Sequence, residues 1–219
     1  VCSGSRGRIT SERGEQRIAT ALAGSRSRRK RGNAMHARKW LAGCVAVLVT
    51  TSAHAGLINE NLLVAVPDGY KIDFRDKKKN IVINEMVPVA QSVNDWTEMV
   101  TVQIFLGAKG VTPQQFRTTM EGRWRGACPN SSAHAIADNV ENGYATAVWL
   151  LSCPHNSTTG KPEMTWFKAI QGNDSFYVVQ KAFKFSPSRE QVVTWTRYLR
   201  KIAVCDSRLP ERRCPATAD

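Results

Sequence analysis

Two cysteines and two histidines in the second half of the sequence have side chains that could bind a metal ion. They are Cys128, His134, Cys153 and His155, and thiolate and imidazole are the ligands that zinc prefers. Their spacing lacks the short pairs, roughly two to four residues apart, that are typical of zinc fingers. The competing chemistry is a disulfide between the two cysteines, which an oxidising compartment favours. We therefore predict a disulfide, no metal ion and no cofactor.

Residues for covalent or acid–base catalysis do not form a recognisable motif. The sequence contains no Gly-x-Ser-x-Gly nucleophile motif, no phosphate-binding loop and no dinucleotide fingerprint. Four carboxylates are candidates for acid–base work, although we interpret them as solvated strand and helix faces: Asp73, Glu85, Glu98 and Glu121. The sequence therefore predicts a non-catalytic binding or accessory domain. The alternative is an envelope hydrolase whose active-site residues are dispersed along the chain.

Residues 35–55 have the three parts of a secretory signal peptide. The positive start contains Arg38 and Lys39, and the apolar stretch is residues 40–49. The small-x-small cleavage pattern is formed by Ala53 and Ala55, with cleavage before Gly56. The apolar stretch is too short to span a hydrocarbon core of about 30 Å. We therefore expect a single mature domain, residues 56–219, that is periplasmic or secreted and has no transmembrane segment.

Residues 1–34 are rich in arginine, serine and glycine and have no apolar periodicity. We interpret them as a disordered basic leader or as translation upstream of a start at Met35, and the alternative is a basic arm that binds a partner. Residues 1–55 carry eleven Lys and Arg against two acidic residues, so most of the +13 formal charge lies there. The mature domain is only mildly basic, and we do not expect it to bind nucleic acid.

Residues 41–44, Leu-Ala-Gly-Cys, also match a lipobox, the motif in which a bacterial lipoprotein receives its lipid on the cysteine. A lipid-anchored envelope component, modified at Cys44, is therefore an alternative to cleavage before Gly56. Four cysteines remain after the signal peptide, and an even number in an exported domain predicts two disulfides. Three pairings are open. We favour Cys128 with Cys153 and Cys205 with Cys214, because the second pair encloses a short polar loop.

Alternating apolar residues and turn residues predict the strands. We expect residues 70–75 and 81–87 to form a hairpin and residues 97–106 to form a single strand. Two further hairpins are expected: residues 133–138 with 144–151 around Asn142-Gly143, and residues 163–170 with 176–185 around residues 172–174. Residues 57–66 are apolar and fit either a strand or a helix. Thr112, Pro113 and Gln115 predict a helix start with a capping box, and Gly126 is expected to end that helix.

A second helix follows Ser186-Pro187 and has one apolar face, with Val192, Trp195, Leu199 and Ile202. Strands joined by hairpins, with two helices, predict an α+β fold: an antiparallel sheet of about six to seven strands packed with two main helices and stapled by disulfides. This order resembles the PsbP-like α/β sandwich over most of residues 66–204. Residues 96–102, followed by Thr112-Pro113, also resemble exported bacterial proteins of unknown function. The resemblance implies partner binding, and it transfers no functional residue.

Aromatic and basic side chains supply the remaining candidates. We expect Trp124, Trp149 and Trp195 in the core, and one of the neighbours Trp166 and Phe167 on the surface as a partner anchor. Arg197, Arg200 and Lys201 lie on the polar side of the second helix and are a candidate anion-binding face. The alternative is an ordinary solvated helix face. The expected partner is an envelope protein or an anionic ligand.

Overall fold

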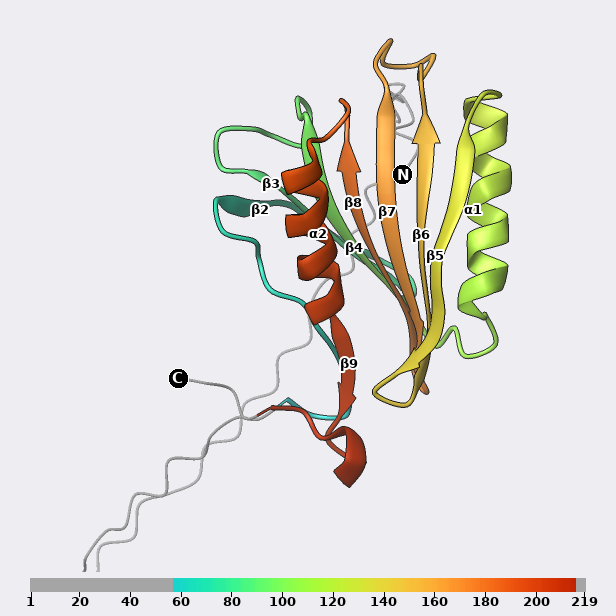
Figure 1. Cartoon of the computed structure of the whole chain (residues 1–219). Helices are drawn as coiled ribbons and strands as arrows, with labels where there is room; N and C mark the ends of the chain where they lie inside the picture. The colour runs from blue at the N-terminus through green and yellow to red at the C-terminus, as the bar shows by residue number, and fades with distance from the viewer. Residues whose placement is uncertain (1–56, 216–219) are drawn as a thin grey trace, which may run out of the picture. The chain divides into compact units, whose positions relative to one another are not determined.

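The computed structural model describes residues 57–215. A seven-stranded antiparallel sheet lies at its centre, in the order β2-β3-β4-β8-β7-β6-β5 (Figure 1). The strands of this sheet are β2 Tyr70–Lys78, β3 Ile81–Pro88, β4 Glu98–Leu106, β5 Ser132–Glu141, β6 Tyr144–Cys153, β7 Glu163–Gln171 and β8 Ser175–Phe183. The helices are α1 Pro113–Ala127 and α2 Arg189–Lys201. The predicted α+β class and number of strands are confirmed.

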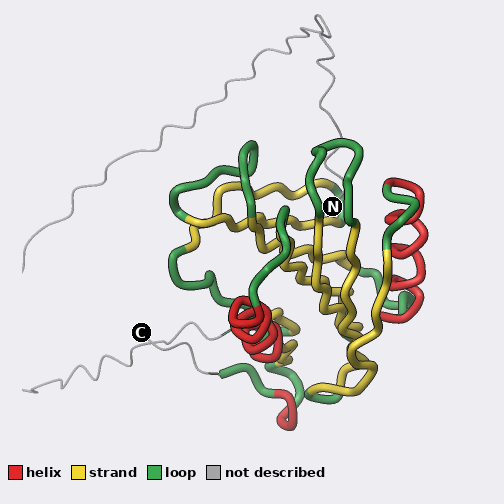
Figure 2. The backbone as a smooth tube through the Cα atoms, turned by 45° about the horizontal axis from the view of Figure 1, so that its top comes forward, coloured by secondary structure: helices red, strands yellow, loops and turns green. Residues whose placement is uncertain are grey.

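The two helices cover opposite faces of the sheet. Helix α1 packs on β6 and β7, where Met120 and Trp124 contact a cluster that includes Trp149 and Phe167. Helix α2 crosses the other face, and its Trp195 is buried in a second cluster, with Leu199, Trp166 and Phe183. Figure 2 shows the two helices on opposite sides of the strands. Burial of each large apolar side chain contributes about 1.5–3 kcal/mol, so both helices are held mainly by packing.

Local sequence determines where the helices begin. The Thr112 side chain accepts a hydrogen bond from the Gln115 backbone, and the Gln115 side chain accepts one from Thr112 in return. Ser188 and Gln191 form the same capping box at the start of α2. The expected end of the first helix at Gly126 was wrong by one residue, because α1 continues to Ala127. The backbone N–H of Cys128 then bonds back to the carbonyl of Trp124.

The hairpin turn between β5 and β6 follows from its two central residues. Asn142 and Gly143 both have positive φ, 48° and 76°, as a tight turn of the type preferred in hairpins requires. Gly143 also lies against the Arg212 guanidinium, with no room for a Cβ atom. The predicted Asn-Gly hairpin is therefore confirmed.

Both disulfides join the predicted cysteines. Cys128 pairs with Cys153, which links the end of α1 to the end of β6, and Cys205 pairs with Cys214. A second, two-stranded sheet was not expected: β1 Glu60–Leu63 pairs with β9 Ala203–Asp206. A 3₁₀ helix, Pro210–Arg212, follows in the segment that was expected to be only a polar loop.

The carboxylate of Glu60 fastens β1 to the main sheet. It accepts hydrogen bonds from the backbone N–H groups of Asn173, Asp174 and Ser175 in the turn between β7 and β8, and from the Tyr177 hydroxyl. A Cβ atom at Gly172 would collide with this carboxylate, so the turn requires glycine there. The chain before the main sheet is thus held by a contact that spans more than a hundred residues of sequence.

The two neighbouring aromatic residues of β7, Trp166 and Phe167, are both in the core. Trp166 and Phe167 point to opposite faces of β7, but each face is covered, and both side chains are buried. The expectation that one of them is exposed was therefore wrong. The leader, the signal peptide with its cleavage site and Cys44 lie outside the described residues. Within residues 57–215, no helix is long and apolar enough to cross a membrane.

Candidate functional site

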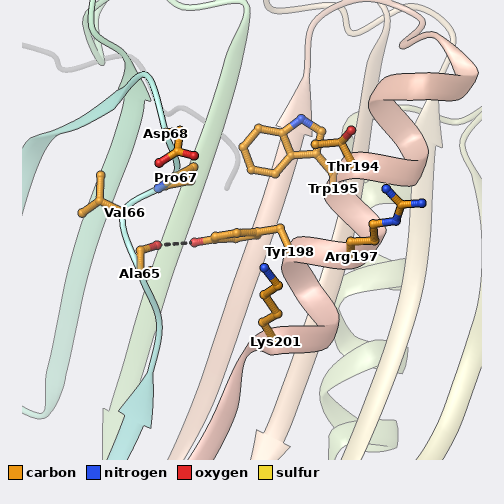
Figure 3. A pocket seen from close by; sticks show the side chains of 9 residues that line it. All are labelled: Ala65, Val66, Pro67, Asp68, Thr194, Trp195, Arg197, Tyr198 and Lys201. Atoms are coloured by element: carbon orange, nitrogen blue, oxygen red, sulfur yellow. Dashed lines mark hydrogen bonds between the residues drawn. The ribbon is translucent and has the colours of Figure 1, made fainter. Parts of the chain in front are cut away.

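The candidate site is a groove between helix α2 and the segment that joins β1 to β2 (Figure 3). Its main cavity has a volume of about 420 Å³ and is lined by Ala65, Val66, Pro67, Asp68, Thr194, Trp195, Arg197, Tyr198 and Lys201. A second cavity of about 330 Å³ adjoins it and shares Ala65, Tyr198 and Lys201. We call the two cavities together the α2 groove.

Helical spacing brings the α2 side chains to one wall of the groove. Thr194, Tyr198 and Lys201 follow one another at intervals of four and three residues, so they share one side of the helix. The Tyr198 hydroxyl crosses the groove and donates a hydrogen bond of 2.8 Å to the carbonyl of Ala65 (Figure 3). Burial raises the pKa of this hydroxyl to about 12. Tyr198 therefore separates the two cavities as a neutral bridge.

Two of the three predicted cationic residues line this groove. Arg197 and Lys201 are exposed at its rim, whereas Arg200 lies on the other side of α2, beside a different cavity. None of the three side chains forms an ion pair or hydrogen bond within residues 57–215. All lie in the last turns of α2, where the helix dipole favours positive charge. The structure thus divides the predicted anion-binding face into a pair and a single residue.

A buried ammonium group lies beneath Trp195. Lys181 on β8 is fully buried, and its Nζ atom lies 3.6 Å from the centroid of the Trp195 ring. This atom donates hydrogen bonds to the Tyr70 hydroxyl (2.6 Å) and to the Glu98 carboxylate (2.7 Å). Burial lowers the pKa of Lys181 to about 8, against the opposing effect of Glu98. Burial and Glu98 both raise the pKa of Tyr70.

A lysine that loses its proton near neutral pH has the reactivity of a nucleophile. Lys181, however, is covered by Trp195 on one side and lies over the Tyr70 and Phe183 rings on others. A substrate in the α2 groove would meet the indole of Trp195 and not the amine. We therefore assign Lys181 a structural role under the floor of the groove.

A second buried lysine holds the end of α2. The Nζ atom of Lys168 on β7 donates to the backbone carbonyls of Leu199 (3.1 Å) and Ile202 (2.8 Å), and it pairs with the Glu141 carboxylate. The last carbonyls of a helix have no partner within the helix. Lys168 therefore satisfies the end of α2 from the sheet below it.

The sequence did not indicate these two lysines. Neither Lys168 nor Lys181 is among the residues that the sequence patterns single out. Each is the only charged residue in a short segment of a mostly buried strand, in Trp-Phe-Lys-Ala-Ile and Val-Gln-Lys-Ala-Phe. That pattern is the available signal, because a cation inside a covered strand requires a buried partner.

The other candidate residues do not converge on a catalytic arrangement. His134 and His155 are exposed, and the cysteines beside them form the disulfide, so the zinc alternative loses its thiolates. The Asp73 carboxylate accepts a hydrogen bond from the Val93 N–H. This hydrogen bond, and the contact with the Lys71 ammonium, lower the pKa of Asp73. Glu121 pairs with arginines of its own helix. Within residues 57–215, no group of three His, Cys, Asp or Glu side chains could hold a metal ion.

Two residues near the start of β4, Trp96 and Glu98, each contact a lysine. Glu98 was interpreted as a solvated carboxylate, but it is mostly buried as the partner of Lys181. Trp96, at the entrance of β4, is half-buried, and the Lys184 ammonium lies 3.8 Å from its ring centroid. Trp96 is therefore satisfied within the domain by a cation–π contact.

The fold and groove define a disulfide-stapled α+β domain with one face of α2 open to a ligand. No family model matches the chain. No curated protein matches it either. Similar solved structures include the Ran-binding protein Mog1p of Saccharomyces cerevisiae, with 11% identity, 65% of this chain and 85% of that chain covered, and a TM-score of 0.37.

Two further similar structures come from bacteria. Cyanobacterial PsbP from Synechocystis has 10% identity and a TM-score of 0.39, with 73% of this chain and 94% of that chain covered. LpqN, involved in cell envelope biogenesis of Mycobacterium tuberculosis, has 8% identity and a TM-score of 0.34, with 70% and 87% covered. PsbP, expected from the order of elements, is thus among the similar structures. We base no functional argument on similarity at this level.

Proposed function

We propose that this protein is an exported, non-catalytic binding domain whose α2 groove holds an acidic polysaccharide. The observation that carries the proposal is the convergence of Arg197 and Lys201 on a concave, largely apolar groove. Binding sites of this kind combine apolar walls with a few polar groups that orient the ligand. Both cations lack an anionic partner within the described residues, so their charge is available to a ligand.

Export is supported by two independent features. Residues 35–55 have the pattern of a signal peptide. The four cysteines that follow it all form disulfides, which persist in oxidising compartments such as the periplasm. An intact-mass measurement tests this part of the proposal. We expect a chain that starts at Gly56 with two disulfides, whereas a retained leader or a lipid mass on Cys44 would contradict it.

The shape of the groove favours a single chain over a membrane surface. The Tyr198 bridge to Ala65 divides the groove, so a flat array of lipid head groups would reach the two cations at its rim but would leave both cavities unfilled. The opposite wall carries Asp68, and Thr194 faces it. Asp68 repels any anion placed beside it but accepts hydrogen bonds from sugar hydroxyls, which each unit of an acidic sugar chain carries besides its carboxylate. An acidic sugar chain therefore fits both the cations and Asp68.

A binding measurement with a defined probe tests the ligand. We expect oligogalacturonate to bind the full chain, uncharged malto-oligosaccharide not to bind, and the affinity to fall with added salt because the contacts are exposed charges. The double variant Arg197→Glu, Lys201→Glu should lose about tenfold or more in affinity. The matched control, Arg189→Glu with Arg200→Glu, makes the same change in net charge elsewhere on α2 and should retain binding.

Two results would overturn the proposal in different ways. Equal loss in both double variants would show that net charge attracts the probe and that the groove does not hold it. Binding of phosphatidylglycerol vesicles or polyglutamate in preference to oligogalacturonate would contradict the polysaccharide.

A further inference from the structure

The two edges of the main sheet differ in how they are protected. Edge strands expose unpaired backbone groups and are commonly blocked by charged side chains. Strand β2 has that protection, with Lys71, Asp73, Arg75, Asp76, Lys77 and Lys78 in nine residues. Strand β5, at the other edge, has no Lys or Arg in its ten residues and only two acidic residues, Asp138 and Glu141. No strand within the described residues pairs with the outer side of β5.

Side chains on β5 are exposed on both faces of the strand. Ile136 is 53% exposed and Val140 is 69% exposed, although both are large and apolar. Ile136 is also the extra residue of a β-bulge, since Ala135 pairs with Trp149 and Ala137 pairs with the next residue, Val148. Bulges redirect a side chain near the end of regular pairing. Here the bulge brings Ile136 to the mouth of a cavity.

This cavity lies between β5 and α2, on the side of the helix opposite the α2 groove. It has a volume of about 280 Å³ and is lined by Ile136, Ala137, Asn139, Glu141, Val148, Trp166, Lys168, Thr196, Leu199 and Arg200. Its walls are mainly apolar. Ala137, Asn139 and Glu141 all come from the straight part of β5 that follows the bulge. The open edge and the cavity therefore belong to the same five residues, 137–141.

We propose that residues 137–141 of β5 bind an extended peptide of a partner protein, which adds a strand to the sheet and places an apolar side chain in this cavity. Added strands gain affinity from backbone hydrogen bonds and specificity from pockets for alternate side chains. A strand paired with these residues directs every second side chain toward the α2 side of the sheet. There it would lie beside Ala137 and Asn139, whose small side chains leave the cavity open.

The charges around the cavity indicate the chemistry of that peptide. The two acidic residues of this part of β5 are already neutralised, Asp138 by Arg117 and Glu141 by Lys168. Arg200 has no anionic partner within residues 57–215 and lies at the cavity wall. The unbalanced charge is therefore positive. The peptide that complements it has an acidic residue two positions away from its apolar one, so that both side chains face the α2 side of the sheet.

A second copy of the chain fits this edge less well than a peptide. Two β5 strands that paired along their whole length would pass through the bulge at Ile136 in both copies, which interrupts the regular register. A short segment can pair with residues 137–141 alone, a length of about 17 Å. The edge therefore favours a short partner segment over a symmetric dimer.

The test uses two synthetic peptides of about seven residues, in which valine and threonine surround a central leucine. In one peptide the residues two positions before and after the leucine are glutamates, and in the other they are lysines, so that these side chains share the leucine's face of the strand. Titration into the isotope-labelled full chain is followed by backbone amide chemical shifts. We expect the glutamate peptide to shift the amides of residues 137–141 and of Thr196 and Arg200, with an affinity at least about tenfold higher than that of the lysine peptide.

Matched variants decide whether Arg200 and the strand edge cause this preference. Arg200→Glu should reverse it, so that the lysine peptide binds better, because the contact then has the opposite sign. Arg197→Glu, which makes the same change on the far side of α2, should leave it unaltered. A glutamate peptide with proline in place of leucine should not bind, since proline cannot complete the added strand.

The proposal is overturned if neither peptide shifts the amides of residues 137–141, or if Arg200→Glu and Arg197→Glu change the preference equally. A concentration-dependent dimer whose interface is β5 would also overturn it, in favour of a second copy. These outcomes are separate from those for the α2 groove, where Arg197 and Lys201 are decisive and Arg200 is the control.

Discussion

Lys168 and Lys181 lie under the same helix but are held in opposite ways. Lys168 neutralises the end of α2 through two backbone carbonyls and one carboxylate. Lys181 is surrounded by the rings of Tyr70, Phe183 and Trp195, and Glu98 is its only carboxylate partner among residues 57–215. The first lysine satisfies groups that would otherwise be unpaired, and the second bears a desolvation cost that lowers its pKa. Equal burial therefore does not imply an equal contribution to stability.

The largest effect should come from removing the ring that covers Lys181. Trp195→Ala deletes a core side chain, opens a cavity and exposes the ammonium to water, and we expect a loss of about 3–5 kcal/mol in the free energy of unfolding. Urea denaturation of the full chain measures this loss. Trp195→Phe, which retains an aromatic cover, is the control and should lose clearly less. An equal loss would contradict the prediction, since a phenylalanine ring over Lys181 would then stabilise the fold no more than alanine does.

The next effect should come from Lys168. Replacement by methionine keeps the apolar stem but removes the ammonium donor from the carbonyls of Leu199 and Ile202 and leaves Glu141 without its cation, whereas the Leu199 carbonyl keeps the backbone N–H of Ile202. We expect a loss of about 2–3 kcal/mol, since an unsatisfied buried acceptor costs about 1–3 kcal/mol. Amide hydrogen exchange should show faster opening of the last turn of α2 than of its first turn. Uniform acceleration along α2 would contradict the capping role.

Sequence patterns predicted the elements of the main sheet because their signals are local. Asn142-Gly143 specifies its turn by backbone conformation, and Thr112 with Gln115 specifies a helix start by two reciprocal hydrogen bonds. The β1–β9 pair has no comparable signal. It depends on Glu60 reaching a turn more than a hundred residues away, and such a contact has no periodicity in the sequence.

The candidate site was predictable only in part for a related reason. Helical periodicity placed Arg197, Arg200 and Lys201 on the polar side of α2, and this is where they lie. It could not show that Ala65 and Tyr198 close a groove on one side of that helix, nor that the bulge at Ile136 opens a cavity on the other. Both features depend on which distant segments flank α2.

The next prediction concerns how the free energy of unfolding depends on pH through Lys181. The pKa of Lys181 is about 8 in the folded protein and near 10.5 in the unfolded chain. Between these values the unfolded chain binds more protons, so the free energy of unfolding rises as pH increases from about 8 to about 10. We expect a gain of about 2 kcal/mol, relative to Lys181→Met measured in parallel. The raised pKa of Tyr70 acts in the opposite direction above about pH 10.

The smallest effect should be that of Lys181→Met at neutral pH. Methionine retains contact with the rings and removes the desolvation cost of the ammonium, while Glu98 keeps some contact with water. We expect a loss of about 1 kcal/mol, and nearly none in the double variant Lys181→Met, Glu98→Gln, because replacing both members of a buried pair is often neutral. Denaturation of the two variants beside Lys168→Met checks the order. A loss for Lys181→Met that equals or exceeds the loss for Lys168→Met would remove the distinction between the two sites, since Lys181 would then stabilise the fold as strongly as the lysine that caps α2.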